Sequence, residues 1–192
     1  MKVIGITGNY ASEENTAPRC YLMADSSVLF TGRPFFVPDF ARGFVACPAI
    51  VVRTGRLGKC IAPKFASRYW DALTAGFTVR AVDSDDELLE GLDRAFDGSA
   101  IVGDWVTTSS IDEPLNTSLV FMVNGETVSQ CCLADLVHPV NNLLVAISTR
   151  CSIKMGDMIF TGDAGPGCTL QPGDRLTATM ADRQILDVKV RL

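Results

Sequence analysis

Short apolar runs broken by turn-forming residues dominate the chain, and most of them are typical of β-strands. The clearest hairpin lies at 119–132, because Asn124-Gly125 suits a two-residue type I′ turn between β-rich arms. A Thr54-Gly55 turn inside 49–61 predicts another. The last stretches of the chain alternate polar and apolar residues, as strands with one buried face do. The predicted strand regions are 1–10, 27–40, 49–61, 119–132, 174–180 and 185–192.

Helical spacing of apolar residues is less common. Residues 62–76 carry such spacing, and residues 84–96 follow Ser84, which suits a helix N-cap. Residues 133–150 predict a pair of helices broken at Pro139. No linker, repeat or low-complexity segment divides the chain. We therefore expect a single β-rich α+β domain spanning residues 1–192.

Composition narrows the function classes. The 192 residues are 47% hydrophobic and 20% charged, which suits one compact domain with a sizeable core. A net charge of -5 without a Lys/Arg cluster argues against a nucleic-acid partner. No stretch approaches the roughly 18 apolar residues of a membrane helix, and the apolar run of 1–10 is too short for a signal peptide. These features predict a cytoplasmic protein that binds neither nucleic acid nor membrane.

The cysteines and the lone histidine favour packing roles. Seven scattered cysteines are best interpreted as reduced thiols, and the absence of a C-x2-C pair argues against zinc. Cys131 and Cys132 end a predicted strand, so at least one should point into the core as a small hydrophobe. His138 precedes a proline and has no evident orienting partner for general-base work.

Two polar segments could carry chemistry. The acidic run Asp83, Asp85, Asp86 and Glu87 has the oxygen ligands that a hard cation prefers, although capping of the following helix explains it more simply. Residues 153–176 hold five glycines, two prolines and three aspartates. Such a loop either lines a cleft with backbone N–H groups or only turns the chain.

Eight sequence blocks are spread over nearly the whole chain: GNYASEE, RPFFVPDF, VVRTGRLGK, FASRYWDALTAGF, AFDGSAIVG, VNGETVSQ, SIKMGDMIFTGDAGPG and LQPGDRLTATM. In this order, they resemble the fumarylacetoacetate hydrolase family. The resemblance implies a mixed β-sandwich roll and a homodimer. It also implies hydrolysis, decarboxylation or isomerisation of β-keto or acylpyruvate-type acids, with a divalent cation held by a Glu-x-Glu pair and an aspartate.

The chain departs from the family pattern at those cation positions. Alignment on the VVR run places Cys47 and Ala49 at the two glutamates, and Thr78 at the aspartate. A thiol, a methyl group and a hydroxyl are poor replacements for carboxylates around Mg²⁺. No carboxylate occurs between Asp39 and Asp71, so a shift in register does not restore the pair.

Other positions of the family site differ too. Glu13 stands at the histidine of the general base, and Thr16 at the acid that partners it. Arg94 replaces a lysine, which keeps the charge and changes its geometry. The family's TGTPxGxG loop is matched by Thr161, Gly162 and Asp163, with the aspartate in place of a threonine. Met23 and Val82 replace a lysine and an arginine.

These departures support three hypotheses. The leading one is a catalytically degenerate family member that needs no cofactor and binds a small carboxylic acid or a protein in the old cleft. The alternative is an active hydrolase, isomerase or decarboxylase with a rebuilt site that uses Arg94, Asp163, Asp83, Asp85 or Cys47. The third is an interaction subunit that pairs with an intact paralogue. In the leading hypothesis, the 153–176 loop is a former substrate loop that now serves as a turn.

Overall fold

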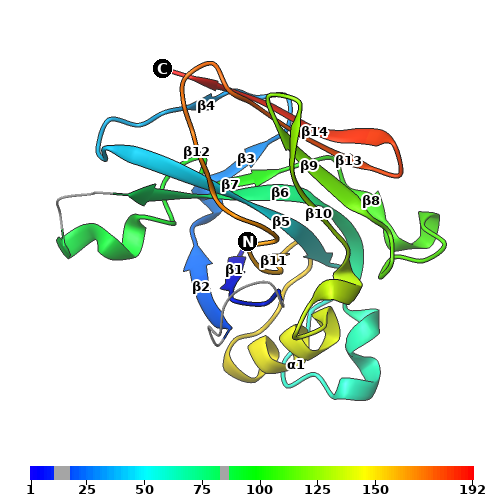
Figure 1. The fold of residues 1–192 in the computed structure, drawn as a ribbon. Helices are drawn as coiled ribbons and strands as arrows, with labels where there is room; N and C mark the ends of the chain where they lie inside the picture. Colours follow the sequence, from blue (N-terminus) through cyan, green and yellow to red (C-terminus); the bar gives the residue numbers. More distant parts are fainter. Residues whose placement is uncertain (11–17, 83–86) are drawn as a thin grey trace.

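The computed structural model describes residues 1–10, 18–82 and 87–192 (Figure 1). Its α-helix is α1 (Val140–Arg150), and 3₁₀ helices cover Asp25–Ser27, Pro63–Arg68, Glu87–Leu92, Thr108–Ser110 and Leu133–Asp135. The strands are β1 (Val3–Thr7), β2 (Arg19–Met23), β3 (Val28–Phe30), β4 (Phe35–Phe36), β5 (Gly43–Thr54), β6 (Trp70–Val82), β7 (Ala100–Val102), β8 (Val106–Thr107), β9 (Leu119–Val123), β10 (Glu126–Cys131), β11 (Met158–Phe160), β12 (Cys168–Thr169), β13 (Arg175–Met180) and β14 (Arg183–Arg191).

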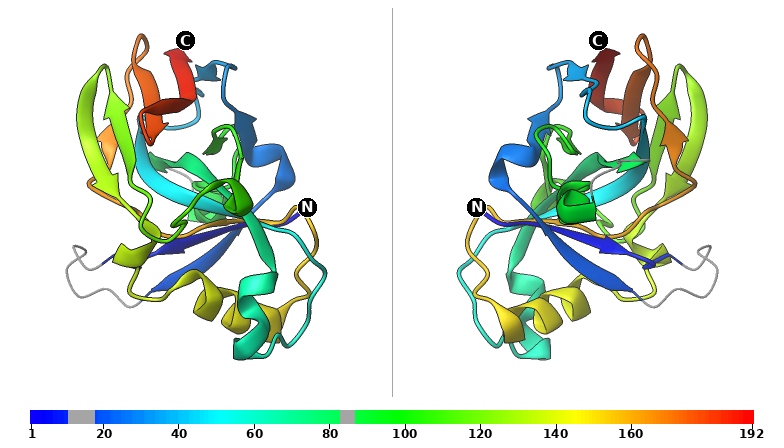
Figure 2. Two further views of the ribbon diagram at one scale, coloured as in Figure 1. Left: turned by 90° about the vertical axis from the view of Figure 1, so that its right-hand side faces the viewer. Right: turned by 90° about the vertical axis from the view of Figure 1, so that its left-hand side faces the viewer.

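The described strands form two sheets. The larger has the order β2-β1-β11-β5-β6-β7-β3, with β12 added to β5 and β8 to β6; the smaller has the order β10-β9-β13-β14-β4. The larger sheet is mixed, because β1 runs parallel to β11 and β3 to β7, whereas β5 and β6 are antiparallel. It curls through the middle of the molecule, with α1 and the Pro63–Arg68 turn together on one side (Figure 2). The predicted β-rich α+β class is confirmed.

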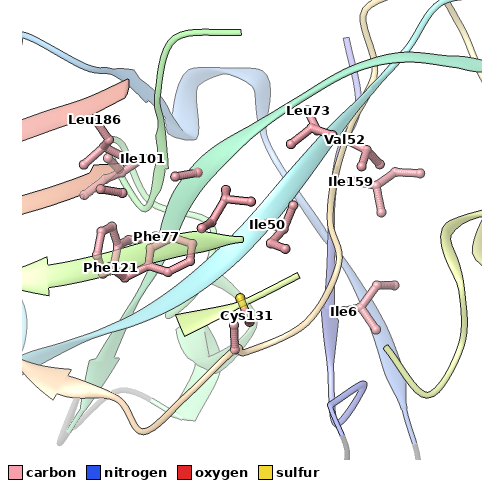
Figure 3. Packing of buried hydrophobic residues seen from close by; sticks show 14 of the residues in the cluster. Ile6, Ile50, Val52, Leu73, Phe77, Ile101, Phe121, Cys131, Ile159 and Leu186 are labelled. Carbon is pink, nitrogen blue, oxygen red and sulfur yellow. The ribbon is translucent and has the colours of Figure 1, made fainter. Parts of the chain in front are cut away.

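The two faces of the large sheet bury different clusters. From β5, Ile50 and Val52 join the main core, whereas Ala49 and Val51 point to the opposite face and join a smaller apolar cluster. Figure 3 shows how the small sheet packs against the main core, where Phe77 and Phe121 meet edge to face with ring centroids 5.6 Å apart. The smaller cluster forms the floor of the region described below.

The predicted helix over 62–76 is wrong beyond its first turn. The chain leaves the 3₁₀ helix at Arg68 and enters β6 at Trp70. Residues of β6 bury both faces, so their apolar run carries no period of 2 and imitates helical spacing. Gly76 does not end a helix; a Cβ there would lie 2.6 Å from the Ile101 carbonyl oxygen, so a glycine is needed where the strands pass.

The structure confirms some of the other local predictions and corrects others. The Asn124-Gly125 hairpin is confirmed, with φ of 53° and 86° at its two turn residues. The hairpin at Thr54-Gly55 is wrong, because β5 pairs with β6 and the bridge at Gly58 joins residues 56–61 to Ile153 instead of to β5. Of the helix predicted over 84–96, the structure shows a 3₁₀ helix at Glu87–Leu92 followed by a turn, and Ser84 lies outside the described residues.

The pair of helices over 133–150 is confirmed as a 3₁₀ turn followed by α1, which begins after Pro139. No helix among the described residues is long and apolar enough to span a membrane.

Candidate functional site

The positions that the family alignment assigns to a cation lie on one face of the large sheet. Cys47 of β5 is directly opposite Thr78 of β6, and Thr78 is 3% exposed. Ala49 lies two residues further along the same face and is fully buried. It packs in the smaller apolar cluster with Met23 and Phe160. Two positions of this face are therefore polar, and the third is part of an apolar floor.

Asp163 reaches this face from the loop after β11. The loop is held alongside β5, because Thr161 N–H donates to the Ile50 carbonyl at 2.9 Å and Ala164 N–H to the Pro48 carbonyl at 2.7 Å. The Thr78 hydroxyl donates to Asp163 Oδ1 over a long 3.4 Å. The loop therefore runs alongside β5 and brings Asp163 to this face, and its description as a former substrate loop that serves as a turn stays a prediction.

Gly162 and Asn9 set the path of this loop. Gly162 has φ +148°, and a Cβ there would lie 3.0 Å from the side chains of Asn9 and Tyr10. Asn9 is fully buried, and its amide donates to the Thr161 carbonyl at 2.8 Å and to the His138 carbonyl at 3.1 Å. These contacts fix the segment that presents Asp163.

Few polar contacts offset the desolvation of the Asp163 carboxyl group. Desolvation raises its pKa above the ordinary aspartate value, while Arg94, the Thr78 hydroxyl and Arg80 act in the opposite direction. In the described part of the chain, neither arginine comes close enough to Asp163 to form an ion pair. The result is a half-buried carboxyl group that keeps its proton more readily than an exposed one.

Arg94 and Tyr21 complete the polar side of the site. The Arg94 guanidinium carbon lies 5.3 Å from the centre of the Tyr21 ring, a cation–π arrangement. Arg94 Nη1 and the Tyr21 hydroxyl are both buried and have no hydrogen-bond partner among the residues that the structure describes. Buried polar groups are normally paired, so two orphan groups in one place indicate a site for a polar ligand.

Cys47 lies under the same loop. A Cβ on Gly167 would be 3.1 Å from its sulfur, so the loop passes directly over the thiol. Burial raises the pKa of the Cys47 thiol to about 12, with a further contribution from Asp163. The thiol is therefore protonated at neutral pH and is neither a nucleophile nor a ready metal ligand.

The remaining predicted residues lie apart from this site or outside the described residues. His138 is exposed, and its backbone N–H donates to Asn9 Oδ1 at 2.8 Å. Cys131 is buried and Cys132 half-buried, as predicted for one core-facing thiol. Val82 ends β6. The residues that fall outside the described part of the chain are Glu13, Thr16, Asp83, Asp85 and Asp86, together with the side chain of Glu87.

The described side chains supply few donors for a cation. Asp163 is the carboxylate at this face, and Cys47 and Thr78 add a thiol and a hydroxyl. Among the described residues, no group of three His, Cys, Asp or Glu side chains is arranged to hold a metal ion. The site that they form is a protonatable carboxyl group beside cationic and hydroxyl groups.

The sequence prediction missed Tyr21 and Asn9. A glycine inside the first strand, Gly5, was the available signal for Tyr21, because a glycine in a strand interior often marks a close approach of another group. Asn9 gave a weaker signal as a polar residue directly after an apolar strand.

Comparison with known proteins identifies the family. The fumarylacetoacetate (FAA) hydrolase C-terminal model matches residues 5–191. An oxaloacetate tautomerase of Escherichia coli is 34% identical over 87 residues, which are 45% of this chain and 40% of that protein. A mitochondrial oxaloacetate tautomerase of Caenorhabditis elegans is 21% identical over 86% of this chain and 80% of its own length.

The fold agrees with this relationship. The crystal structure of a fumarylpyruvate hydrolase of Pseudomonas aeruginosa, in complex with Mn²⁺ and pyruvate, has a TM-score of 0.88 at 19% identity. The match covers 100% of this chain and 90% of that chain. The predicted family fold is thereby confirmed, and the chain belongs to the fumarylacetoacetate hydrolase family.

Proposed function

We propose that this chain is an isomerase of a small 2-oxo acid that moves a proton between a carbon and the carbonyl oxygen. One observation carries the proposal. Asp163 is a half-buried carboxyl group with a raised pKa and no ion-pair partner among the described residues, and it lies within the electrostatic influence of Arg94, whose Nη1 has no partner among those residues either. This combination is typical of acid–base sites, because a structural carboxylate in the same place would be fully hydrogen-bonded.

The proposed chemistry needs two groups. The Asp163 carboxylate takes a proton from the carbon beside the substrate carbonyl. The electron pair of that C–H bond becomes the C=C bond of an enolate, and the π pair of the C=O bond moves to the oxygen. Asp163 then returns the proton to that oxygen, so that the keto acid becomes its enol and the enzyme is regenerated. A raised pKa suits this task, because a base is most effective when its pKa approaches the working pH. Arg94 binds the negative charge.

The residues at the family's cation positions do not fit a magnesium or manganese ion. Cys47 is protonated, Ala49 has no donor atom, and Thr78 offers a neutral hydroxyl. We therefore propose a site whose positive charge comes from Arg94 and Arg80, both of which lower the pKa of Asp163. No step of the proposed reaction passes through a metal ion.

The printed functions of the relatives support the reaction class. Two are oxaloacetate tautomerases, and one solved structure of similar fold is a 5-carboxymethyl-2-hydroxymuconate delta-isomerase of Mycobacterium smegmatis. Each of these names describes movement of a proton or double bond in an organic acid. The predictions of a homodimer and of a cytoplasmic location are kept as parts of this proposal.

A second candidate function is binding without turnover, as in a catalytically degenerate protein. The observation that favours it is the apolar floor, where Met23 and Ala49 are 6% and 0% exposed at positions that carry charges in the family pattern. The side chains of this floor lack the charged groups that the family reaction uses. It leaves Asp163 and Arg94 as the groups that hold a ligand.

The experiment is hydrogen–deuterium exchange at the carbon next to the carbonyl of oxaloacetate and of an acylpyruvate, followed by NMR with EDTA present. We expect exchange above the buffer rate for the native protein. Asp163→Asn should reduce it by about 10²- to 10⁴-fold, because it removes the base. Asp97→Asn is the matched control, since Asp97 is exposed, and should exchange at the native rate. Native protein that binds the acid without exchange would favour the binding function.

A further inference from the structure

Tyr21 is held against the large sheet by a gap in the neighbouring strand. It lies in β2 directly opposite Gly5 of β1. A Cβ on Gly5 would be 2.1 Å from Tyr21 Cζ and 2.5 Å from its hydroxyl oxygen. The ring therefore lies across β1 in space that only a glycine leaves open, and its hydroxyl is directed inward rather than to solvent.

The inner end of Tyr21 meets Arg94. The guanidinium carbon is 5.3 Å from the ring centre, and among the described residues Tyr21 Oη and Arg94 Nη1 are buried without a partner at hydrogen-bonding geometry. The tyrosine hydroxyl can accept as well as donate, and Arg94 and Thr78 both lie close enough to lower its pKa. An arginine nitrogen can only donate, so the protons of this pair need an acceptor, and an oxygen atom of a bound anion would supply one.

We propose that Tyr21 is a catalytic residue of this site, whose hydroxyl donates a hydrogen bond to the carbonyl oxygen of a bound 2-oxo acid beside Arg94. This inference rests on the proposed function. The bond strengthens as the carbonyl oxygen gains negative charge, so Tyr21 and Arg94 together stabilise the enolate. The reaction that Asp163 carries out is unchanged, and Tyr21 keeps its own proton throughout.

The surroundings of Tyr21 keep its hydroxyl protonated. Burial raises the pKa of Tyr21, and Asp163 raises it further, while Arg94 and Thr78 lower it. A tyrosine with a raised pKa is a hydrogen-bond donor at neutral pH. Asp163 is among the groups that raise the pKa of Tyr21, so the base and the donor belong to one region of the molecule.

A purely structural role would not need the hydroxyl. The Tyr21 ring packs against the smaller apolar cluster, and a phenylalanine ring would do the same. An unpaired buried hydroxyl destabilises the ligand-free fold. Tyr21→Phe should therefore raise the urea midpoint of the ligand-free protein while it weakens the site.

The test uses oxalate, a planar dianion that resembles the enolate of a 2-oxo acid. Calorimetric titration should show oxalate binding about 10- to 100-fold weaker in Tyr21→Phe than in the native protein. Turnover should fall about 10²- to 10³-fold in kcat with little change in KM, because the bond forms mainly in the transition state. Tyr69→Phe, which removes a hydroxyl from a half-buried tyrosine of the main core, is the control and should match the native protein.

The outcomes separate the two proposals. Native-like oxalate affinity and kcat in Tyr21→Phe would overturn the role of Tyr21 and leave the proposed isomerase intact. Tyrosine-dependent oxalate binding without turnover in the native protein would support the donor pair and refute the isomerase. A native protein that does not bind oxalate would overturn the donor pair.

Discussion

Two aspartates, six residues apart, have opposite environments, and one is buried while the other is half-buried. Asp157 precedes β11 and is 1% exposed; it accepts hydrogen bonds from the backbone N–H groups of Lys2 and Lys154, each at 2.8 Å, and pairs with Lys2 Nζ at 2.5 Å. Asp163 follows the same strand and accepts one bond from Thr78 at 3.4 Å. The first carboxylate is satisfied by the protein, and the second is not.

This difference separates structural from functional charge. The contacts of Asp157 join the start of β1 to the turn before β11, so its charge holds two neighbouring strands in register. The fold gains nothing comparable from Asp163, whose raised pKa shows that its charged form is less stable in the protein than in water. A local conflict of this kind is expected at a site where a ligand supplies the missing contacts.

The largest expected effect is on stability, at Asp157. Asp157→Ala leaves the Lys2 and Lys154 N–H groups without their acceptor and breaks the ion pair. It should lower the free energy of unfolding by about 3 kcal/mol. Urea denaturation of Asp157→Ala and Asp163→Asn, compared side by side, measures this loss of stability. We expect Asp163→Asn to be as stable as the native protein, or more stable, at neutral pH. A loss in Asp163→Asn as large as that in Asp157→Ala would show that both carboxylates are structural.

A smaller effect is expected from closing the space under Tyr21. Gly5→Ala places a methyl group 2.1 Å from Tyr21 Cζ, so the ring must move away from Arg94. Overpacking of this kind costs about 1–3 kcal/mol. Gly91→Ala is the control, because no atom lies within 4 Å of its added Cβ. Thermal unfolding measures the stability, and loss of oxalate binding in Gly5→Ala alone would link the gap to the site.

The sequence predicted the parts of this molecule that depend on local patterns. The Asn124-Gly125 hairpin and the strands β13 and β14 followed from turn chemistry and alternation. The path of β6 did not, because a strand buried on both faces has no period that distinguishes it from a helix.

The candidate site was predictable in part. The family motifs drew attention to Cys47, Thr78, Arg94 and Asp163, and the structure brings Thr78 into contact with Asp163 and places Cys47 directly opposite Thr78. Tyr21 was not predictable from its own sequence neighbourhood. Its role depends on Gly5 in the neighbouring strand and on Arg94, which is far away in sequence, so only the folded chain brings these groups together.

The pH dependence of stability should distinguish Asp163 from an ordinary carboxylate. Because its folded pKa is raised, the folded state binds more protons than the unfolded state above about pH 4. Its contribution to stability is therefore greatest in acid and decreases as the pH rises through the folded pKa. The difference in unfolding free energy between Asp163→Asn and the native protein should grow from pH 4 toward neutrality. A constant difference would mean that burial does not perturb the group.

The smallest effect, and one of opposite sign, is expected at Asp187, a carboxylate whose side chain is 33% exposed. Asp187 accepts two bonds from Arg175, from Nε at 2.8 Å and from Nη2 at 2.6 Å, and these bonds lower the pKa of Asp187. The charged form of Asp187 therefore contributes to the stability of the fold above the ordinary aspartate pKa. This contribution is lost as the pH falls through the lowered pKa. The difference in unfolding free energy between Asp187→Asn and the native protein should therefore become smaller in acid. At neutral pH, 1 M NaCl should also reduce that difference.

Solvent screens this pair, so the change in the urea midpoint should be the smallest of the series. If Asp187→Asn shifted the urea midpoint as far as Asp157→Ala does, ion pairing alone would explain both shifts. Burial would then not be needed to explain the contrast between Asp157 and Asp163. If its pH dependence had the same sign as that of Asp163, the assignment of Asp187 as a carboxylate stabilised by Arg175 would fail. Opposite signs would show that Arg175 stabilises the charged form of Asp187, whereas desolvation destabilises the charged form of Asp163.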